Sequence, residues 1–249
     1  MSIDPRTLFS ATAREYALYR PRYPRALFEY LFDCCPDLDR AWDCATGSGQ
    51  AAVALAERFA EIEATDASPE QIENAEPHER IRYSLQPAES TNFPDRHFSL
   101  VTVGQALHWF DLEAFWPEVQ RVLKPRGVFA AWTYTWPRVT ESIDRIVATR
   151  LLDIIAGYWL PHNQLVMEGY ASIEFPFHEL PPPSLTLQQY WTLQQFLAYV
   201  GTWSATRRAV DELGDEFLRE LSEGLQDAWG DQDREVTMDF YCRTGRHES

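Results

Sequence analysis

Short apolar runs alternate with amphipathic helical stretches between residues 25 and 135, and this alternation limits the choice of fold more than any other feature of the chain. Strand–helix alternation at this spacing is typical of βαβ units, in which helices cover both faces of a parallel sheet. We therefore predict an α/β fold for this part. The strand-like runs are residues 41–44, 62–65, 81–85, 100–103 and 128–133.

The pattern changes after Tyr134. Scattered aromatic residues and the run Pro181-Pro182-Pro183 interrupt the alternation. Residues 211–235 carry ten acidic side chains against two arginines, which is typical of a solvated helix face. Residues 236–242 alternate well enough to predict a late strand that returns to the sheet.

Charge and cysteine usage narrow the class of protein. The chain has 22 basic and 38 acidic residues, a net charge of −16. Such a balance repels phosphate backbones and anionic lipids, so we expect neither a nucleic-acid nor a membrane partner. The four cysteines show no CxxC pair and no zinc spacing, so we expect neither disulfides nor a metal site. The start of the chain lacks a signal-like apolar region, and we expect a cytoplasmic protein.

The sharpest local signal is the segment Asp43-Cys44-Ala45-Thr46-Gly47-Ser48-Gly49-Gln50, between a predicted strand and a predicted helix. Gly47 and Gly49 permit a tight turn that a ligand can approach closely, and the helix start offers free N–H groups. Asp66 ends the next strand, 19 residues after Gly47, where a carboxylate can accept the hydroxyls of a ribose. The pattern predicts a nucleoside-containing cofactor across the ends of these strands.

The same loop bears on which cofactor binds. A dinucleotide fingerprint would place a third glycine where this chain has Ala52. The carboxylate of Asp43 would repel a pyrophosphate but suits a cofactor that carries an ammonium group. S-adenosylmethionine therefore fits better than NAD(P). An NAD(P)-linked oxidoreductase and a non-catalytic cofactor-binding protein remain the alternatives.

Four segments together resemble a known family. They are Tyr19-Arg20-Pro21-Arg22-Tyr23-Pro24, the Asp43–Gln50 loop, Asp66, and Gln105-Ala106-Leu107-His108-Trp109-Phe110-Asp111. The chain resembles class I S-adenosylmethionine-dependent methyltransferases of the type 11 family, in the trans-aconitate methyltransferase-like branch. The resemblance implies a Rossmann-like fold with a seven-stranded, mostly parallel sheet. It also implies S-adenosylmethionine as cofactor and S-adenosylhomocysteine as product.

The resemblance further implies roles for single residues. The loop contacts the methionine part of the cofactor, and Ala45 departs from the more usual glycine. Asp66 binds the ribose, Ala67, Ala88 and Glu89 lie at the adenine, and Gln105 lies beneath the transferable methyl group. The expected cofactor-binding residues are Tyr16, Arg20, Asp43, Ala45, Gly47, Gly49, Asp66, Ala67, Ala88, Glu89 and Gln105.

The acceptor is a small molecule in this interpretation, with carboxyl O-methylation to a methyl ester as the first hypothesis. His108 is the candidate general base, although it could equally serve only to shape the pocket. A carboxylate is already ionised at pH 7 and needs no base. The candidate pocket residues are Trp109, Trp132, Trp203 and Arg207, and we expect a monomer or a weak homodimer.

The expected organisation has four parts. An N-terminal lid segment (1–24) precedes the cofactor-binding core (25–135). A substrate-covering insertion with further helices (136–234) follows, and the last strand (235–249) returns to the core sheet.

Overall fold

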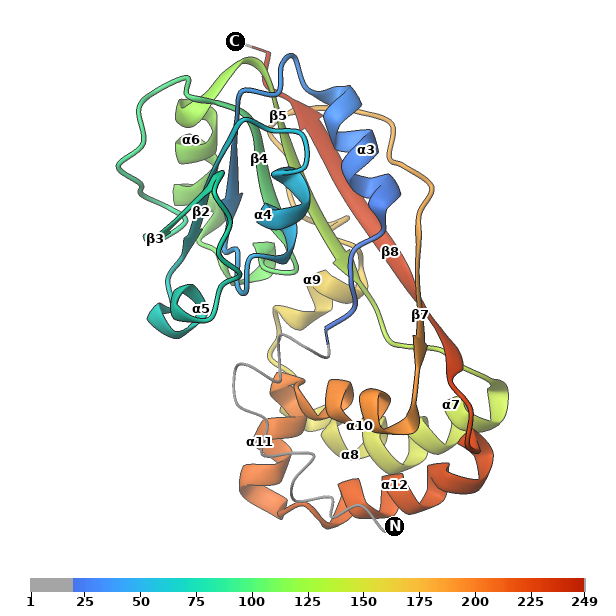
Figure 1. Cartoon of the computed structure of the whole chain (residues 1–249). Helices are drawn as coiled ribbons and strands as arrows, with labels where there is room; N and C mark the ends of the chain where they lie inside the picture. Colours follow the sequence, from blue (N-terminus) through green and yellow to red (C-terminus); the bar gives the residue numbers. More distant parts are fainter. Residues whose placement is uncertain (1–19, 249) are drawn as a thin grey trace. The chain divides into compact units, whose positions relative to one another are not determined.

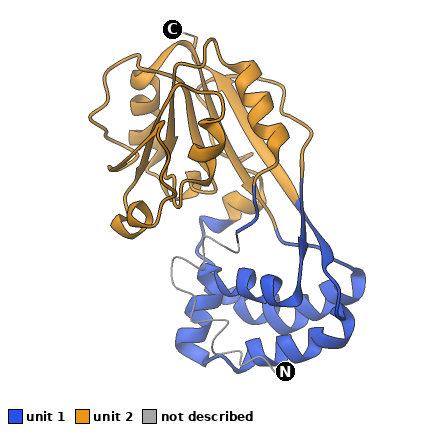
Figure 2. Ribbon diagram, in the orientation of Figure 1, with its two compact units in different colours: residues 1–22, 136–163, 187–238 blue, residues 23–135, 164–186, 239–249 orange. Residues whose placement is uncertain are grey.

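The computed structural model describes residues 20–248 and divides them into two compact units (Figure 2). The sheet unit comprises residues 23–135, 164–186 and 239–248, and the helical unit comprises residues 20–22, 136–163 and 187–238. Each unit is described by itself below. The expected insertion therefore contributes residues 164–186 to the sheet unit.

The sheet unit is built on the strand order β3-β2-β1-β4-β5-β8-β6. The pairs among β1 to β5 are all parallel, whereas β8, red in Figure 1, is antiparallel to β5 and β6. This order confirms the predicted Rossmann-like fold with a mostly parallel sheet. The resemblance implied seven strands, whereas the described residues form eight, because β7 (Thr186–Trp191) also pairs with β8. The strands are β1 (Arg40–Cys44), β2 (Glu61–Asp66), β3 (Ile81–Leu85), β4 (Phe98–Gly104), β5 (Leu123–Tyr134), β6 (His178–Glu179) and β8 (Arg234–Arg246), whose residues 234–238 belong to the helical unit.

Alternating side chains of the strands cover the two faces of the sheet. On one face, Trp42, Val101 and Phe129 form a continuous buried cluster with Phe115 and Val119 of α6. On the other, Trp132 of β5 meets the ring of Phe28 on α3 edge to face, at 6.3 Å between centroids. The helices of this unit are α3 (Arg25–Cys34), α4 (Gln50–Leu55), α5 (Pro69–Glu73), η1 (Leu107–Trp109), α6 (Leu112–Val122) and α9 (Asn163–Met167), whose first residue belongs to the other unit.

The order of the strands reverses at β1, because β2 and β3 lie on one side of it and β4 and β5 on the other. Strand β1 pairs with β2 on one side and with β4 on the other. In open α/β sheets, ligands bind outside the carboxyl ends of the strands at such a switch point. The ends of β1, β2 and β4 are therefore where a site is expected.

The helical unit packs amphipathic helices around its own core. Helix α12 buries Leu218, Leu221, Leu225 and Trp229, which recur at helical spacing along one face. The capping box predicted at Thr192 is present, since its side chain accepts from the backbone N–H of Gln195. The elements are α7 (Glu141–Val147), η2 (Ala148–Leu152), α8 (Asp153–Ile155), η3 (Ala156–Tyr158), β7 (Thr186–Trp191), α10 (Leu193–Gly201), α11 (Ser204–Leu213) and α12 (Glu216–Trp229).

Strand β5 begins earlier than the sequence pattern predicts. Lys124-Pro125-Arg126-Gly127 is a typical helix stop, so the strand was expected from residue 128. In the structure α6 passes directly into β5 at Leu123, which pairs with Phe98 across a register shift in β4. Pairing with the neighbouring strand thus overrides the local turn chemistry.

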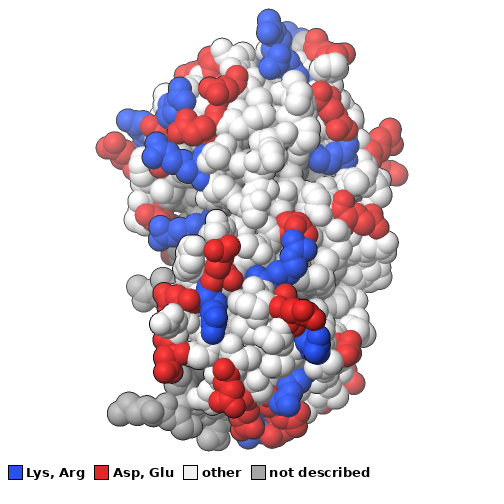
Figure 3. All heavy atoms as spheres, turned by 90° about the vertical axis from the view of Figure 1, so that its right-hand side faces the viewer, with Lys and Arg blue, Asp and Glu red and all other residues white. Residues whose placement is uncertain are grey.

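Acidic and basic side chains are interspersed on one face of the molecule (Figure 3). Arg145 and Glu141 form such an exposed pair, at 2.8 Å, and pairs of this kind contribute about 0–1 kcal/mol. Within residues 20–248, no helix has both the length and the apolar character that crossing a bilayer requires.

Candidate active site

The loop after β1 carries the first group of predicted residues. Ala45, Gly47 and Gly49 all adopt positive φ angles, of 55°, 58° and 85°. Glycine reaches this region freely, whereas an alanine there is strained by roughly 1 kcal/mol. Ala45 therefore occupies a position that favours glycine, which explains why glycine is usual there.

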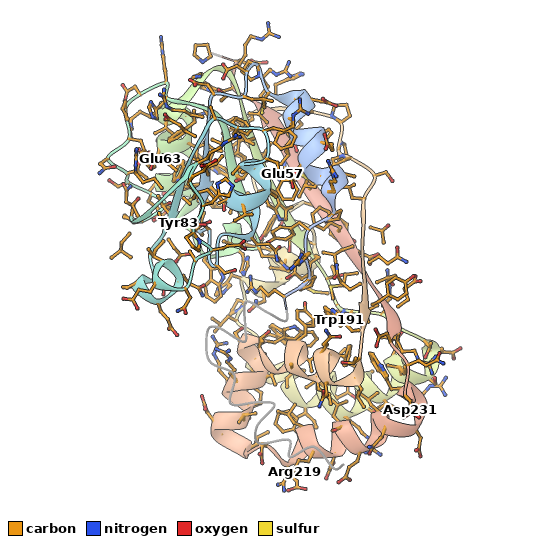
Figure 4. The ribbon with its side chains drawn as sticks, in the orientation of Figure 1. Glu57, Glu63, Tyr83, Trp191, Arg219 and Asp231 are labelled. Carbon is orange, nitrogen blue, oxygen red and sulfur yellow. The ribbon has the colours of Figure 1, made fainter. Side chains whose placement is uncertain are left out.

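Gly49 is required by its surroundings as well as by its backbone. A Cβ atom at this position would collide with the hydroxyl of Tyr83. Tyr83 lies on β3, next to the strand that carries Glu63 (Figure 4), and its hydroxyl donates to the carbonyl of Glu76 at 2.7 Å. The Glu76 N–H in turn donates to the carbonyl of Ser48 at 3.1 Å. Hydrogen bonds from the segment that precedes β3 thus stabilise the glycine turn.

Asp43 lies at the end of β1 and is almost completely buried, at 1% exposure. Its two oxygens accept from the hydroxyls of Thr46 at 2.6 Å and Thr102 at 2.8 Å. Burial raises the pKa of Asp43 to about 6, in spite of these hydrogen bonds, which favour the charged form. A buried carboxylate held in this way is suited to a cationic group of a ligand.

Asp66 lies at the end of β2, directly beside the loop. Its Oδ2 atom accepts from the N–H of Gly47 at 2.9 Å, and its Oδ1 atom accepts from the N–H of Ser68 at 2.9 Å. Each carboxylate oxygen has a second lone pair, so the clamped side chain can still accept two ribose hydroxyls. The structure therefore brings Asp43, Gly47 and Asp66 together at neighbouring strand ends, as the spacing predicts.

The predicted adenine residues follow β2 and β3. Ala67 is exposed, and Ala88 is buried in the segment after β3. The Glu89 carboxylate accepts from the N–H of Asp111 at 3.1 Å, which links this segment to the start of α6. The N–H of Gln86 donates to the carbonyl of Asp66 at 3.1 Å. Gln86 thus joins the ends of β2 and β3 through its backbone.

The end of β4 places Gln105 and His108 together. Gln105 has a positive φ of 57°, and its N–H donates to the carbonyl of Trp132 at 2.9 Å. His108 is half-buried on η1, and its Nδ1 atom lies 3.1 Å from the hydroxyl of Tyr170. Trp109, the next residue, is 53% exposed. Tyr170 was not predicted, because no local motif marks it and it lies 62 residues from its partner.

The remaining predicted residues belong to the sheet core, to the helical unit or to the part of the chain that is not described. Trp132 is fully buried and packs edge to face on Tyr23, at 5.2 Å between ring centroids. Arg20, Trp203 and Arg207 belong to the helical unit. Tyr16 lies outside the described residues. The roles assigned to these residues stay predictions.

Trp203 is part of an aromatic cluster within the helical unit. Its ring centroid lies 5.1 Å from that of Trp136 and 6.0 Å from that of Trp159, and those two rings are 5.0 Å apart. Tyr199 meets Trp203 edge to face at 5.6 Å. The three tryptophans are each partly exposed, so the cluster presents an apolar surface.

The chain is similar to known methyltransferases. A family model described as a methyltransferase domain matches residues 42–131. A protein of Dictyostelium discoideum assigned as a methyltransferase is 29% identical over 225 residues, covering 89% of this chain and 86% of its own. A solved structure from Anaeromyxobacter dehalogenans, assigned as a type II methyltransferase, is 40% identical with a TM-score of 0.85, covering 92% of this chain and 98% of its own. A Saccharomyces cerevisiae protein assigned as an S-adenosylmethionine-dependent methyltransferase is 24% identical, covering 88% and 91%.

Proposed function

The chain belongs to the class I S-adenosylmethionine-dependent methyltransferases, and from this premise we propose that it transfers the methyl group to a small-molecule acceptor. The observation that carries the proposal is the pair of carboxylates at the ends of β1 and β2, with the glycine turn between them. The NAD(P)-linked alternative is not favoured, because the matched domain and the relatives are methyltransferases.

We assign the cofactor-binding residues the roles that the resemblance implies, and this geometry supports the assignment. The clamped carboxylate of Asp66 accepts the ribose hydroxyls, and buried Asp43 favours the cationic methionine end electrostatically. The turn at Gly47 and Gly49 admits the methionine backbone without a side chain in the way. When bound, the cofactor supplies an electrophilic methyl group on a sulfonium. The residues of the chain bind and orient the reactants, and alignment of this kind can contribute roughly 7–11 kcal/mol to lowering a barrier.

Two acceptor chemistries are compatible with this site. The resemblance to the trans-aconitate methyltransferase-like branch supports a carboxylate that becomes a methyl ester. Such an acceptor is ionised at neutral pH and requires no base. The hydrogen bond between His108 and Tyr170 supports a second candidate, an acceptor that must lose a proton, because it orients an imidazole at the end of β4.

Two experiments test the proposal. Calorimetric titration with S-adenosylhomocysteine should show binding to the wild-type protein, and equally tight binding of NADH with none of S-adenosylhomocysteine would contradict the cofactor assignment. Incubation of a metabolite extract with methyl-labelled cofactor, followed by mass spectrometry, should yield a methylated small molecule. Cofactor binding without any labelled product in a broad screen would favour a non-catalytic cofactor-binding protein.

A further inference from the structure

A charged pair on helix α6 forms hydrogen bonds with the main chain of a neighbouring segment. Glu118 is buried in this helix, at 9% exposure, and Arg121 lies about one turn further along. The Nε and Nη2 atoms of Arg121 donate to the two oxygens of Glu118, at 2.9 and 2.7 Å. A bidentate bond of this kind fixes both side chains, because it joins two planar groups through two parallel contacts.

Further hydrogen bonds from the pair reach residues 86–97, which connect β3 with β4 and are called the β3–β4 segment here (Figure 1). The Oε1 atom of Glu118 accepts from the N–H of Thr91 at 2.8 Å and from its hydroxyl at 2.5 Å. The Nη1 atom of Arg121 donates to the carbonyl of Phe93 at 2.7 Å and to the carboxylate of Asp95 at 2.8 Å. The pair thus holds three residues of the segment against α6.

The same segment is closed on itself through Gln86. The N–H of Asn92 donates to the Oε1 atom of Gln86 at 3.0 Å, and the Nε2 atom of Gln86 donates to the Ser84 hydroxyl at 2.9 Å. Ala88 and Glu89 lie between Gln86 and Asn92 in the chain. Both ends of the short stretch that contains them are therefore held in place.

The place of this stretch along the sheet indicates which part of the cofactor it meets. The assigned roles put the amino acid end of the cofactor at the turn after β1 and the ribose at Asp66, where β2 ends. Strand β3 is next in the same order, and its last residue, Leu85, is paired with Asp66. Neighbouring strands lie about 4.8 Å apart, so a base attached to that ribose is expected to extend toward the start of the β3–β4 segment.

We propose that Glu118 and Arg121 are positioning residues, which hold the β3–β4 segment in the conformation that recognises the adenine base of the cofactor. The inference rests on the proposed function, which assigns Ala88 and Glu89 to the adenine. Neither charged residue touches the cofactor in this account, because both act through the main chain of the segment. Ordering a segment costs conformational entropy, so a segment that is ordered before binding gives a tighter and more selective site.

Two ligands that differ only in the base test the inference. S-inosylhomocysteine has an oxo group where S-adenosylhomocysteine has the amino group of adenine. In calorimetry the wild-type protein should bind S-adenosylhomocysteine about tenfold more tightly, which corresponds to one lost hydrogen bond. A wild-type protein that binds both ligands equally would overturn the proposal.

Glu118→Gln keeps the shape of the side chain but has one accepting oxygen where the carboxylate has two. The amide therefore opposes a donor with a donor, either at Arg121 or at Thr91. Affinity for S-adenosylhomocysteine should fall about tenfold, and the preference for adenine should fall to about threefold or less. An equal loss for both ligands would indicate a general effect on the fold and would overturn the inference. Glu113→Gln makes the same change at an exposed position of α6 and should leave both affinities unchanged.

A double variant separates positioning from stability. Loss of one member of a buried pair leaves a charge without its partner, whereas replacement of both members by apolar residues is often neutral for folding. Glu118→Met combined with Arg121→Leu should therefore fold, and it should show the same loss of adenine preference as Glu118→Gln. Retention of the wild-type preference in the folded double variant would overturn the proposal.

Hydrogen exchange of the unliganded protein tests the hold on the segment without any ligand. The N–H groups of Thr91 and Asn92 should exchange about tenfold faster in Glu118→Gln than in Glu113→Gln, while those of β1 exchange equally in both variants. Equal exchange at Thr91 and Asn92 would overturn the inference. Faster exchange together with a wild-type protein that binds neither ligand would contradict the proposed function, and would confine the role of the pair to ordering the segment.

Discussion

The two neighbouring parts of the sheet edge are built from different chemistry. At the ends of β1 and β2, two carboxylates accept hydrogen bonds: Asp43 from threonine hydroxyls and Asp66 from backbone N–H groups. Burial raises the pKa of Asp43. At the ends of β4 and β5, the Thr133 hydroxyl donates to the side-chain oxygen of Gln105, and His108 lies within hydrogen-bond distance of the Tyr170 hydroxyl. Charge at the first part favours a cationic cofactor, whereas hydrogen bonds between polar side chains position the residues of the second part. Loss of charge at the first part should therefore weaken cofactor binding, and loss of a side chain at the second part should affect the acceptor.

The largest effect is expected from Asp66→Ala. The substitution removes the ribose acceptor and the partner of two backbone N–H groups, and hydrogen bonds to a charged group contribute about 1.5–3 kcal/mol each. Affinity for S-adenosylhomocysteine should fall about 100-fold or more in calorimetry. Glu61→Gln, at the other end of β2 in an exposed pair with Arg40, should leave affinity unchanged. Equal affinity of Asp66→Ala and wild type would remove the ribose assignment.

Gly49→Ala is expected to lower the free energy of unfolding by about 2–3 kcal/mol, through backbone strain together with the collision against Tyr83. Gly47→Ala is a control in the same turn, because its φ is also positive, at 58°, but the nearest atom to the added Cβ, Oε1 of Gln71, lies at an ordinary contact distance of 3.7 Å. This substitution should lower the free energy of unfolding by only about 1 kcal/mol. Denaturant titration measures both. Adding Tyr83→Phe should recover part of the loss at Gly49, and equal costs at the two glycines would show that the contact with Tyr83 is unimportant.

Cofactor affinity should depend on pH through Asp43. Its raised pKa of about 6 means that the carboxyl is ionised at pH 7.5 and mostly protonated at pH 5. A cationic ligand favours the ionised form, so the dissociation constant should rise about tenfold between these values. The unliganded protein should show the opposite trend: because the folded pKa lies above the unfolded one, the contribution of Asp43 to stability decreases as pH rises from about 4 to 6. Asp43→Asn should flatten both profiles, and profiles unchanged in that variant would assign the dependence to another group.

The smallest effect on the cofactor is expected from Trp109→Ala. This side chain is largely exposed beside His108, in the part of the edge assigned to the acceptor. KM for the acceptor should rise a few-fold, while the dissociation constant of S-adenosylhomocysteine stays within twofold. A larger change in the dissociation constant of S-adenosylhomocysteine than in KM for the acceptor would contradict the assignment of separate cofactor and acceptor parts.

The sequence contained enough to predict the first part of the edge. Asp43, Gly47 and Gly49 lie in one short segment, and Asp66 is separated from them by a single helix, so the order of elements in the chain brings them together. Such local patterns depend on turn geometry and on the crossover connection, both of which follow general rules.

The second part could not be predicted in the same way. Tyr170 is distant from His108 along the chain, and its role depends on the packing of residues 164–186 into the sheet unit. The early start of β5 likewise depends on pairing with Phe98 rather than on its own residues. In both cases tertiary contacts determine the outcome, and a single sequence contains no periodic signal for them.

The central claim is that carboxylates at adjoining strand ends hold an adenosyl sulfonium cofactor. A crystal structure of the protein with S-adenosylhomocysteine tests it most directly. The account predicts both ribose hydroxyls within hydrogen-bond distance of the Asp66 carboxylate and the amino acid end of the ligand against the turn that follows Asp43. A ligand bound elsewhere, or a ribose held by other side chains, would contradict it.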